Sequence, residues 1–195
     1  MLVSGASLAV AAHSSNPRLG QLITPAAGNA VRGDLPWAAD NGCFGGLDAA
    51  AFCRMLARLP GGALFVVAPD VVADHGLTLA LWHEWRAAVA AHGPVAFVAQ
   101  DGCDAIPDDA GALFVGGSTA FKLGPQARDL VREAKARGLW VHMGRVNTKR
   151  RVMYAHAIGC DSIDGTSASM FPDIYVPRLL RWAEAAERQG AMFQC

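Results

Sequence analysis

The chain has 195 residues, in which 17 Lys and Arg side chains balance 17 Asp and Glu side chains, so its formal net charge at neutral pH is zero. Zero net charge argues against a protein that coats nucleic acid by bulk electrostatics, although it allows a local basic patch. Hydrophobic residues make up 52% of the chain, which is enough for a core. Because no apolar run reaches the length of about 18 residues that a membrane span needs, we expect no membrane-spanning segment.

Short apolar runs recur along the chain, most of them followed by a turn and a longer amphipathic segment. In chain order, we expect strands at SLAVAA (7–12), QLITP (21–25), PWAAD (36–40), ALFVVA (63–68), VAFVAQ (95–100), ALFVGG (112–117), WVHMG (140–144) and CDSID (160–164). We expect helices at about 47–59, 76–92, 125–137, 147–158 and 173–189. Pro125 and Thr148 suit helix starts, Gly138 and Gly159 suit helix ends, and the tail after Gly190 should be loose.

This alternation of strands and helices predicts a parallel sheet with helical crossovers. Eight strands fit an α/β fold of the compact (β/α)8 TIM-like barrel type, with residues 1–195 as a single domain. The first three predicted strands have no full-length helices between them, so the barrel should be irregular at its N-terminal end. An open, doubly wound sheet is the alternative.

The N-terminal stretch MLVSGASLAVAAHSS has a short apolar run without a basic segment before it, so we expect a strand here rather than a signal peptide. The five cysteines are scattered, odd in number and free of a C-x-x-C pair, which indicates reduced thiols in the cytoplasm rather than a disulfide framework. The six histidines also lack metal-binding spacing. We therefore expect neither a metal nor a cofactor.

Polar residues gather at the carboxyl ends of the predicted strands, which share the face of a barrel on which active sites are built. These positions are Asp40-Asn41, Asp70, Asp74, Gln100-Asp101, Gly116-Gly117, Met143-Gly144, Asp161 and Asp164. Each residue alone is an ordinary turn former, but together they suit a planar, amide-rich ligand such as a purine. Two carboxylates on opposite sides of a glycosidic carbon could act as nucleophile and as general acid and base.

Four segments form an ordered set: ADNGCF (39–44), FVAQDG (97–102), LFVGGS (113–118) and WVHMGRVNTKRRVMYAHAIGCDSIDGT (140–166). They resemble, in the same order, motifs of the queuine and archaeosine tRNA-guanine transglycosylase family. The matching family segments are S-D-S-G-G-[FY], then V-Q-G, then G-G-[LF]-[AS]-V-G. The last is Y-L-M-G-[VI]-G with a helix ending in A-[VI]-x-x-G and the sequence D-x-[FV]-D-C. The resemblance covers roughly residues 36–166.

The resemblance implies roles for the aspartates. Asp164 matches the nucleophile that attacks the sugar C1′ and holds a covalent intermediate, and Asp40 matches the general acid and base beside the scissile bond. Asp74 falls near the family's base-reading aspartate, with Asp70 as its competitor. Because strand side chains alternate, Asp161 should face away from Asp164 and either point outward or hold the helix at 147–158.

The resemblance also implies contacts with the base. Gln100 and Gly117, with the adjacent Gly116, match positions that hydrogen-bond the purine carbonyl, and Met143 matches an apolar residue that stacks on the base. The segment RVNTKRR (145–151) starts at a strand end and opens a helix beside this face. Its basic residues could contact phosphates, the alternative being a solvated helix face. They are Arg145, Lys149, Arg150 and Arg151.

The chain departs from the family pattern after the nucleophile. Asp164 is followed by Gly165 rather than Cys, TSASMFPD replaces L-P-T-R, and the family's C-terminal zinc site and tRNA-binding insertions have no counterpart. The catalytic core that remains resembles the short, phage-associated DNA transglycosylases of the superfamily. We therefore expect an enzyme that exchanges guanine in DNA for a 7-deazaguanine, in the host cytoplasm if a phage encodes it.

The expected partners are DNA and a free 7-deazaguanine base. If the DNA is a duplex, the target guanine must be flipped out of the base stack. The alternative polymer is tRNA. An enzyme that acts on free nucleosides and a noncatalytic nucleic-acid-binding subunit are the alternative functions. A homodimer or a partner subunit is also compatible with the sequence.

Overall fold

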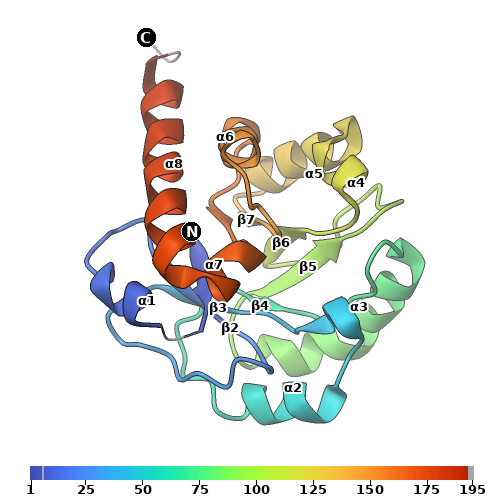
Figure 1. The fold of residues 1–195 in the computed structure, drawn as a ribbon. Coiled ribbons are helices and arrows are strands. Elements are labelled where there is room, and N and C mark those ends of the chain that lie inside the picture. Colours follow the sequence, from blue (N-terminus) through green and yellow to red (C-terminus); the bar gives the residue numbers. More distant parts are fainter. Residues whose placement is uncertain (6, 193–195) are drawn as a thin grey trace.

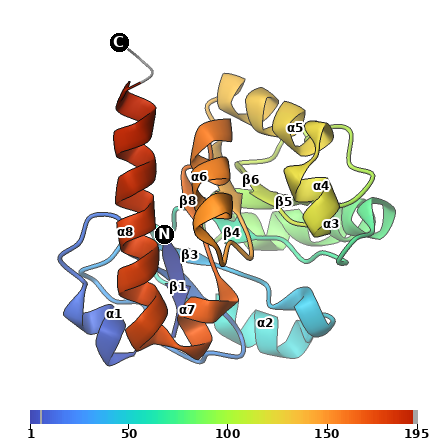
Figure 2. The same ribbon diagram turned by 45° about the horizontal axis from the view of Figure 1, so that its top comes forward.

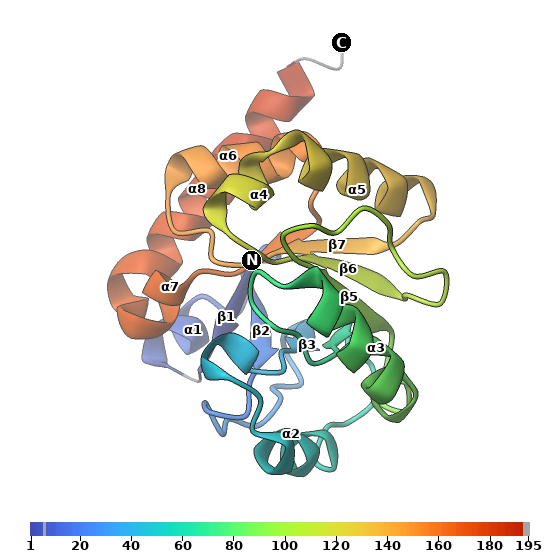
Figure 3. The ribbon, with the colours of Figure 1, turned by 90° about the vertical axis from the view of Figure 1, so that its right-hand side faces the viewer.

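The computed structural model describes residues 1–5 and 7–192. Eight parallel strands, hydrogen-bonded in chain order, curl into a nearly closed barrel with helices around it (Figure 1, Figure 3). This arrangement confirms the expected (β/α)8 TIM-like barrel. The strands are β1 (Leu2–Ser4), β2 (Gly20–Ile23), β3 (Trp37–Ala39), β4 (Val66–Val67), β5 (Val95–Ala99), β6 (Ala112–Val115), β7 (Trp140–Met143) and β8 (Ser162–Ile163).

The strands are almost wholly buried because one face packs inside the barrel and the other packs against helices. Register pairs Val98 with Phe114, Phe114 with His142, and His142 with Ser162, so these side chains point to the same side of the sheet. An apolar cluster fills the inside of the barrel below the strand ends. Its members are Leu2, Leu22, Ala38, Phe65, Val67, Ala96, Val98, Ala112 and Phe114.

Helices cover the outside of the barrel, as Figure 3 shows. They are α1 (Leu8–Ala12), α2 (Ala49–Leu56), α3 (His75–Ala90), α4 (Thr119–Leu123), α5 (Pro125–Ala136), α6 (Lys149–Ile158) and α8 (Pro172–Met192). The 3-10 helix η1 (Cys43–Gly45) and the short helix α7 (Thr166–Met170) lie instead at the carboxyl ends of the strands. In α5, Ala127, Leu130, Val131 and Ala134 are buried, the spacing of a helix with one apolar face. Packing of such faces against the strands produces the outer layer of the core.

The expected helix boundary signals are confirmed. Pro125 begins α5, and Thr148 caps α6 by accepting a hydrogen bond from the Arg151 amide. Gly138 and Gly159 follow α5 and α6 with φ angles of 72° and 100°. These left-handed conformations end a helix and suit glycine.

The N-terminal part of the barrel is irregular, as expected. The five-residue α1 lies between β1 and β2, and β2 is connected to β3 by a segment of turns and loops without a helix. One predicted strand was wrong, because residues 7–12 contain α1 and the first strand is β1. The Ser7 hydroxyl accepts a hydrogen bond from the Val10 amide at 3.2 Å, and the alanine-rich run LAVAA favours a helix once it is capped.

The C-terminal helix is longer than expected. It continues through Gly190 to Met192, while residues 193–195, including Cys195, lie outside the described residues. Figure 2 shows α8 beside α1 and the N-terminus, and α8 also packs on α6. The short helices α4 and α7 were not predicted. Within the described part of the chain, no helix has both the length and the apolar character needed to cross a bilayer.

Candidate active site

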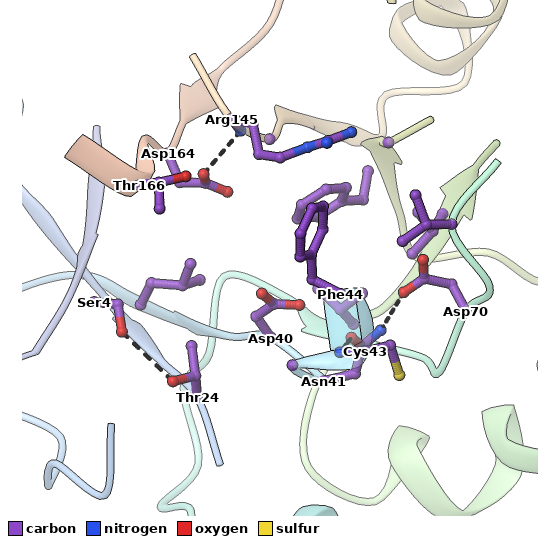
Figure 4. Close-up of a pocket in the computed structure, with 18 of the residues that line it drawn as sticks. Ser4, Thr24, Asp40, Asn41, Cys43, Phe44, Asp70, Arg145, Asp164 and Thr166 are labelled. Atoms are coloured by element: carbon purple, nitrogen blue, oxygen red, sulfur yellow. Dashed lines mark hydrogen bonds between the residues drawn. The ribbon is translucent and has the colours of Figure 1, made fainter. Parts of the chain in front are cut away.

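A cavity of about 300 Å³ opens at the carboxyl ends of the strands. This volume lies at the lower end of the range for small-molecule sites, roughly 300–1,000 Å³. Its lining includes the apolar side chains of Val67, Val98 and Phe114. Polar side chains, among them Asp40, Asp70 and Asp164, surround the same space (Figure 4). Seven of the twelve predicted site residues line it, namely Asp40, Asp70, Gln100, Gly116, Gly117, Arg145 and Asp164.

The carboxylate of Asp164, just past β8, is held by two donors. His142 Nε2 lies 3.1 Å from its Oδ2, and the Arg145 amide donates to its Oδ1 at 2.9 Å. Burial alone raises the pKa of this carboxyl. The hydrogen bond and charge of His142, the Arg145 amide and the charge of Lys122 outweigh burial, so the pKa lies below its usual value. The cavity therefore contains a stabilised aspartate anion at neutral pH.

Asp40, just past β3, has the opposite electrostatic character. Burial raises its pKa to about 7, and the nearby charges of Asp164 and Asp70 act in the same direction. The backbone amides of Gly42 and Asn41 oppose this shift without cancelling it. Asp40 is therefore poised to give up or accept a proton near neutral pH.

Asp70, after β4, lies in a hydrogen-bonded cluster on the other side of the cavity. Asn41 Nδ2 donates to its Oδ1 at 2.7 Å, and Gln100 Nε2 donates to its Oδ2 at 2.6 Å. The Gln100 side-chain oxygen accepts from the Ala73 amide at 2.8 Å. Burial raises the pKa of Asp70, against the lowering effect of Asn41, Gln100 and the Arg145 charge. The cluster presents carboxylate and amide groups in a fixed arrangement.

The two glycines after β6 allow the backbone to approach these side chains closely. A Cβ on Gly116 would lie 2.7 Å from Val98 Cγ1 and 3.0 Å from Gln100 Nε2. Gly117 has a φ of +73°, and a Cβ there would lie 2.6 Å from the Asp101 carboxylate. The Ser118 amide donates to that carboxylate at 2.7 Å, which holds the loop in place. Glycine at both positions leaves backbone exposed to the cavity.

Arg145 spans the mouth of the cavity. Its backbone has a φ of 58°, and its guanidinium donates to the Gly117 carbonyl oxygen. The same group lies 5.1 Å from the centre of the Phe44 ring, a cation–π contact. Phe44 is 72% exposed, so its ring stands at the rim where a planar ligand could stack (Figure 4).

Five predicted site residues lie outside the cavity lining. Asp74 caps α3, where its Oδ1 accepts from the Leu77 amide at 2.9 Å. Met143 points to the opposite face of β7 from His142 and is buried in the core between the barrel and its helices. Lys149, Arg150 and Arg151 occupy the first turn of α6, where Lys149 and Arg150 are exposed.

Asp161 lies at the start of β8, away from the cavity. It accepts two hydrogen bonds from Lys135 Nζ, at 2.8 and 2.7 Å, and one from the Val141 amide at 2.8 Å. It therefore ties α5 and β7 together rather than holding α6. The expected opposition of Asp161 and Asp164 is confirmed.

Two residues around the site were missed by the sequence analysis as members of it, namely His142 beside Asp164 and the buried Lys122. Asn41 was expected at the strand ends without a role, and the structure places it beside Asp70. The alternation of side chains along β7 was the signal available for His142, which lies two residues before Gly144. Among residues 1–5 and 7–192, no group of three or more His, Cys, Asp or Glu side chains is arranged to hold a metal ion.

Comparison with known proteins identifies the fold. No family model matches the chain, and no curated protein matches it. Among solved structures, a native KDPGal structure matches with a TM-score of 0.53 and 16% identity, covering 98% of this chain and 96% of that one. A cube-shaped, highly porous protein cage designed by fusing symmetric oligomeric domains matches with a TM-score of 0.53 and 17% identity, covering 99% and 75%. At such identity the likeness shows a TIM-like barrel alone, a fold that hosts many activities.

Proposed function

We propose that this chain is a base-exchange transglycosylase that replaces guanine in DNA by a 7-deazaguanine through a covalent bond between Asp164 and the sugar. The observation that carries the proposal is the pair of half-buried carboxylates in one cavity. The pKa of Asp40 is raised to about 7, whereas that of Asp164 lies below its usual value. Such a pair supplies both an acid and an anionic nucleophile at neutral pH.

The exchange takes two displacements at C1′. The Asp164 carboxylate attacks C1′, the glycosidic C–N bond breaks, and Asp40 gives its proton to the departing guanine. A 7-deazaguanine then enters, Asp40 takes the proton from its ring N–H, and the freed nitrogen attacks C1′ as the bond to Asp164 breaks. Two inversions give net retention at the sugar.

Base recognition is assigned to the cluster of Asp70 and Gln100. A guanine edge offers a ring N–H and an exocyclic amine, both of which can donate to the Asp70 carboxylate. It also offers a carbonyl oxygen that can accept from Gln100 Nε2 or from the Gly117 amide, because the Gly116 amide already donates to the Ala99 carbonyl oxygen. Asp70 lines the cavity and Asp74 does not, so we assign base reading to Asp70. The apolar lining with Phe114 suits the flat faces of the base.

DNA is preferred as the polymer because no tRNA-binding insertion interrupts residues 36–166, the part of the chain that carries the resemblance. The exposed Lys149 and Arg150 open α6 next to the loop that carries Arg145, so cations stand near the cavity mouth. Lys and Arg at such a place suit backbone phosphates. A duplex substrate requires flipping of the guanine into the cavity.

The test is exchange of labelled guanine. Purified protein is incubated with guanine-containing duplex DNA or with tRNA, each with radiolabelled guanine, and label in the polymer is counted. Incorporation into DNA alone supports the proposal, and incorporation into tRNA alone keeps the chemistry but overturns the polymer. Matched reactions with Asp164→Asn establish that any exchange depends on the nucleophile.

Two outcomes point to other functions. Release of base from free nucleosides, without incorporation into either polymer, indicates a nucleoside enzyme. DNA binding without incorporation, base release or a covalent adduct indicates a noncatalytic subunit.

A further inference from the structure

We propose that Lys122, on α4, is a positioning residue that acts on Asp164 through the peptide group between Gly144 and Arg145. The inference rests on the proposed role of Asp164 as the nucleophile. It assigns to a buried lysine outside the main cavity the task of keeping that carboxylate ionised and oriented.

The geometry links the two side chains through a single peptide group. Lys122 Nζ donates to the Gly144 carbonyl oxygen at 2.8 Å. The N–H of that same peptide, on Arg145, donates to Asp164 Oδ1 at 2.9 Å. Hydrogen bonds on the two ends of one peptide polarise each other, so the ammonium strengthens the N–H that supports the carboxylate. Positive charge on Lys122 thus reaches Asp164 without direct contact.

Lys122 is placed where it cannot touch a substrate in the main cavity. The residue is 4% exposed and lines a small separate pocket behind Gly144, whereas Asp164 lines the main cavity. Buried lysines are rare because burial of the ammonium is costly. A residue of this kind at this position, bonded to one carbonyl, suits an electrostatic role better than simple packing.

The surrounding loops hold both ends of this connection. Ser118 caps α4 by accepting from the Phe121 amide at 3.1 Å, and its hydroxyl lies 2.5 Å from Asp101 Oδ1. On the other side, Arg145 has a φ of 58°, a conformation that few residues other than glycine adopt. Lys122 on the carbonyl and Asp164 on the amide both stabilise this turn.

The charge of Lys122 depends on pH in a useful range. Burial lowers its pKa to about 8, and the charges of Arg145 and Arg151 act in the same direction. Asp164 and Asp101 oppose this change. Below that pKa the lysine is charged and supports Asp164, and above it the support is lost.

The test follows the Asp164 carboxyl by NMR in protein labelled with 13C at aspartate side chains, so it needs no activity. Loss of one signal in Asp164→Asn identifies the residue. In Lys122→Met we expect the pKa of Asp164 to rise by about 0.5–1 pH unit, because a nearby positive charge is removed. Lys122→Arg keeps the charge and should restore most of the shift. Lys135→Met, which removes the lysine bonded to Asp161, is the matched control and should leave the Asp164 titration unchanged.

Each result decides the inference. A folded Lys122→Met protein with an unchanged Asp164 titration overturns it. If that variant does not fold, the Asp40→Asn protein is labelled with 13C at both the lysine Cε atoms and the aspartate side chains, because Asp40 itself would titrate near the same pH. The Asp164 signal must then move as Lys122 loses its proton near pH 8. No movement there overturns the inference as well. The guanine-exchange assay tests the proposed function separately, so coupling without exchange would count against the function alone.

Discussion

His142 lies beside Asp164 inside the barrel, with its Nε2 3.1 Å from Oδ2 of the carboxylate. Its Nδ1 is 2.8 Å from the Ser162 hydroxyl, which also accepts from Trp140 Nε1 at 2.9 Å. An ionised carboxylate only accepts, so the ring nitrogen that faces Asp164, His142 Nε2, carries a proton and donates it to Oδ2. The Phe114 ring, 4.7 Å away between centroids, holds the imidazole in place. The histidine therefore orients Asp164 through a fixed hydrogen bond.

Replacing His142 with Phe should raise the pKa of Asp164 by about one unit, because the side-chain hydrogen bond that favours the anion is lost. The acid limb of the pH profile of guanine exchange should move to higher pH by the same amount. His83→Ala, at an exposed position on α3, is the control and should keep the wild-type profile. An unchanged profile in His142→Phe would show that the histidine has no influence on the reacting group.

Replacing Asp164 with Asn should abolish the covalent adduct and reduce exchange by roughly 10⁴-fold or more, because the amide is a poor nucleophile. The adduct is measured as labelled DNA that stays with the protein on a denaturing gel. Asp161 lies at the other end of β8, so the Asp161→Asn variant is the control and should retain exchange. Its free energy of unfolding should fall by about 1–2 kcal/mol, because the hydrogen bonds to Lys135 and to the Val141 amide become weaker. Exchange by Asp164→Asn at the wild-type rate would show that Asp164 is not the nucleophile.

Asp40 should make the protein less stable as pH rises. Its pKa is about 7 in the fold against 3.8 for an ordinary aspartate, so between these values the folded chain binds more protons than the unfolded chain. The free energy of unfolding then falls with rising pH. Asp40→Asn removes this dependence, so its melting temperature relative to wild type should increase from pH 5 to pH 8.

Thermal melts at intervals across this range check the prediction. Asp173→Asn, in the exposed first turn of α8, is the control, and its difference from wild type should stay level with pH. A constant difference for Asp40→Asn would contradict a raised pKa at this site.

Gly117→Ala should destabilise the protein by about 1–3 kcal/mol, since a side chain is added at a left-handed position. The new Cβ would lie 2.6 Å from Asp101 Oδ2 and 2.8 Å from Phe121 Cδ1. Chemical denaturation measures the change. Gly33→Ala, where nothing lies within 4 Å of the added atom, should be close to neutral. Similar stability losses in both variants would exclude the steric explanation.

Removal of Lys149 and Arg150 should weaken DNA binding without altering the cavity. The slope of log affinity against log salt concentration should fall in magnitude by about one for each phosphate that is no longer neutralised. Binding is measured by fluorescence anisotropy over a range of salt. Arg132→Ala removes an exposed arginine that pairs with Asp129 on α5 and serves as the control. Equal slopes for all variants would place the DNA elsewhere.

The order and type of most elements could be predicted from the sequence because they depend on local patterns. Alternation of apolar runs with amphipathic segments indicated the parallel barrel, and the position of polar residues after each strand indicated the face with the cavity. Side-chain alternation separated Asp161 from Asp164. These are properties of residues near one another in the chain, for which no knowledge of distant contacts is needed.

Other features depend on contacts between distant segments, so only the tertiary structure decided them. Asp70 reaches the cavity because Asn41 and Gln100 from other strands hold it, while Asp74 caps a helix instead. The opposite pKa shifts of Asp40 and Asp164 come from burial and from neighbours brought together by folding, as does the link from Lys122. Strand ends bring polar groups to one face, but burial and hydrogen bonding across the barrel determine the protonation of each group.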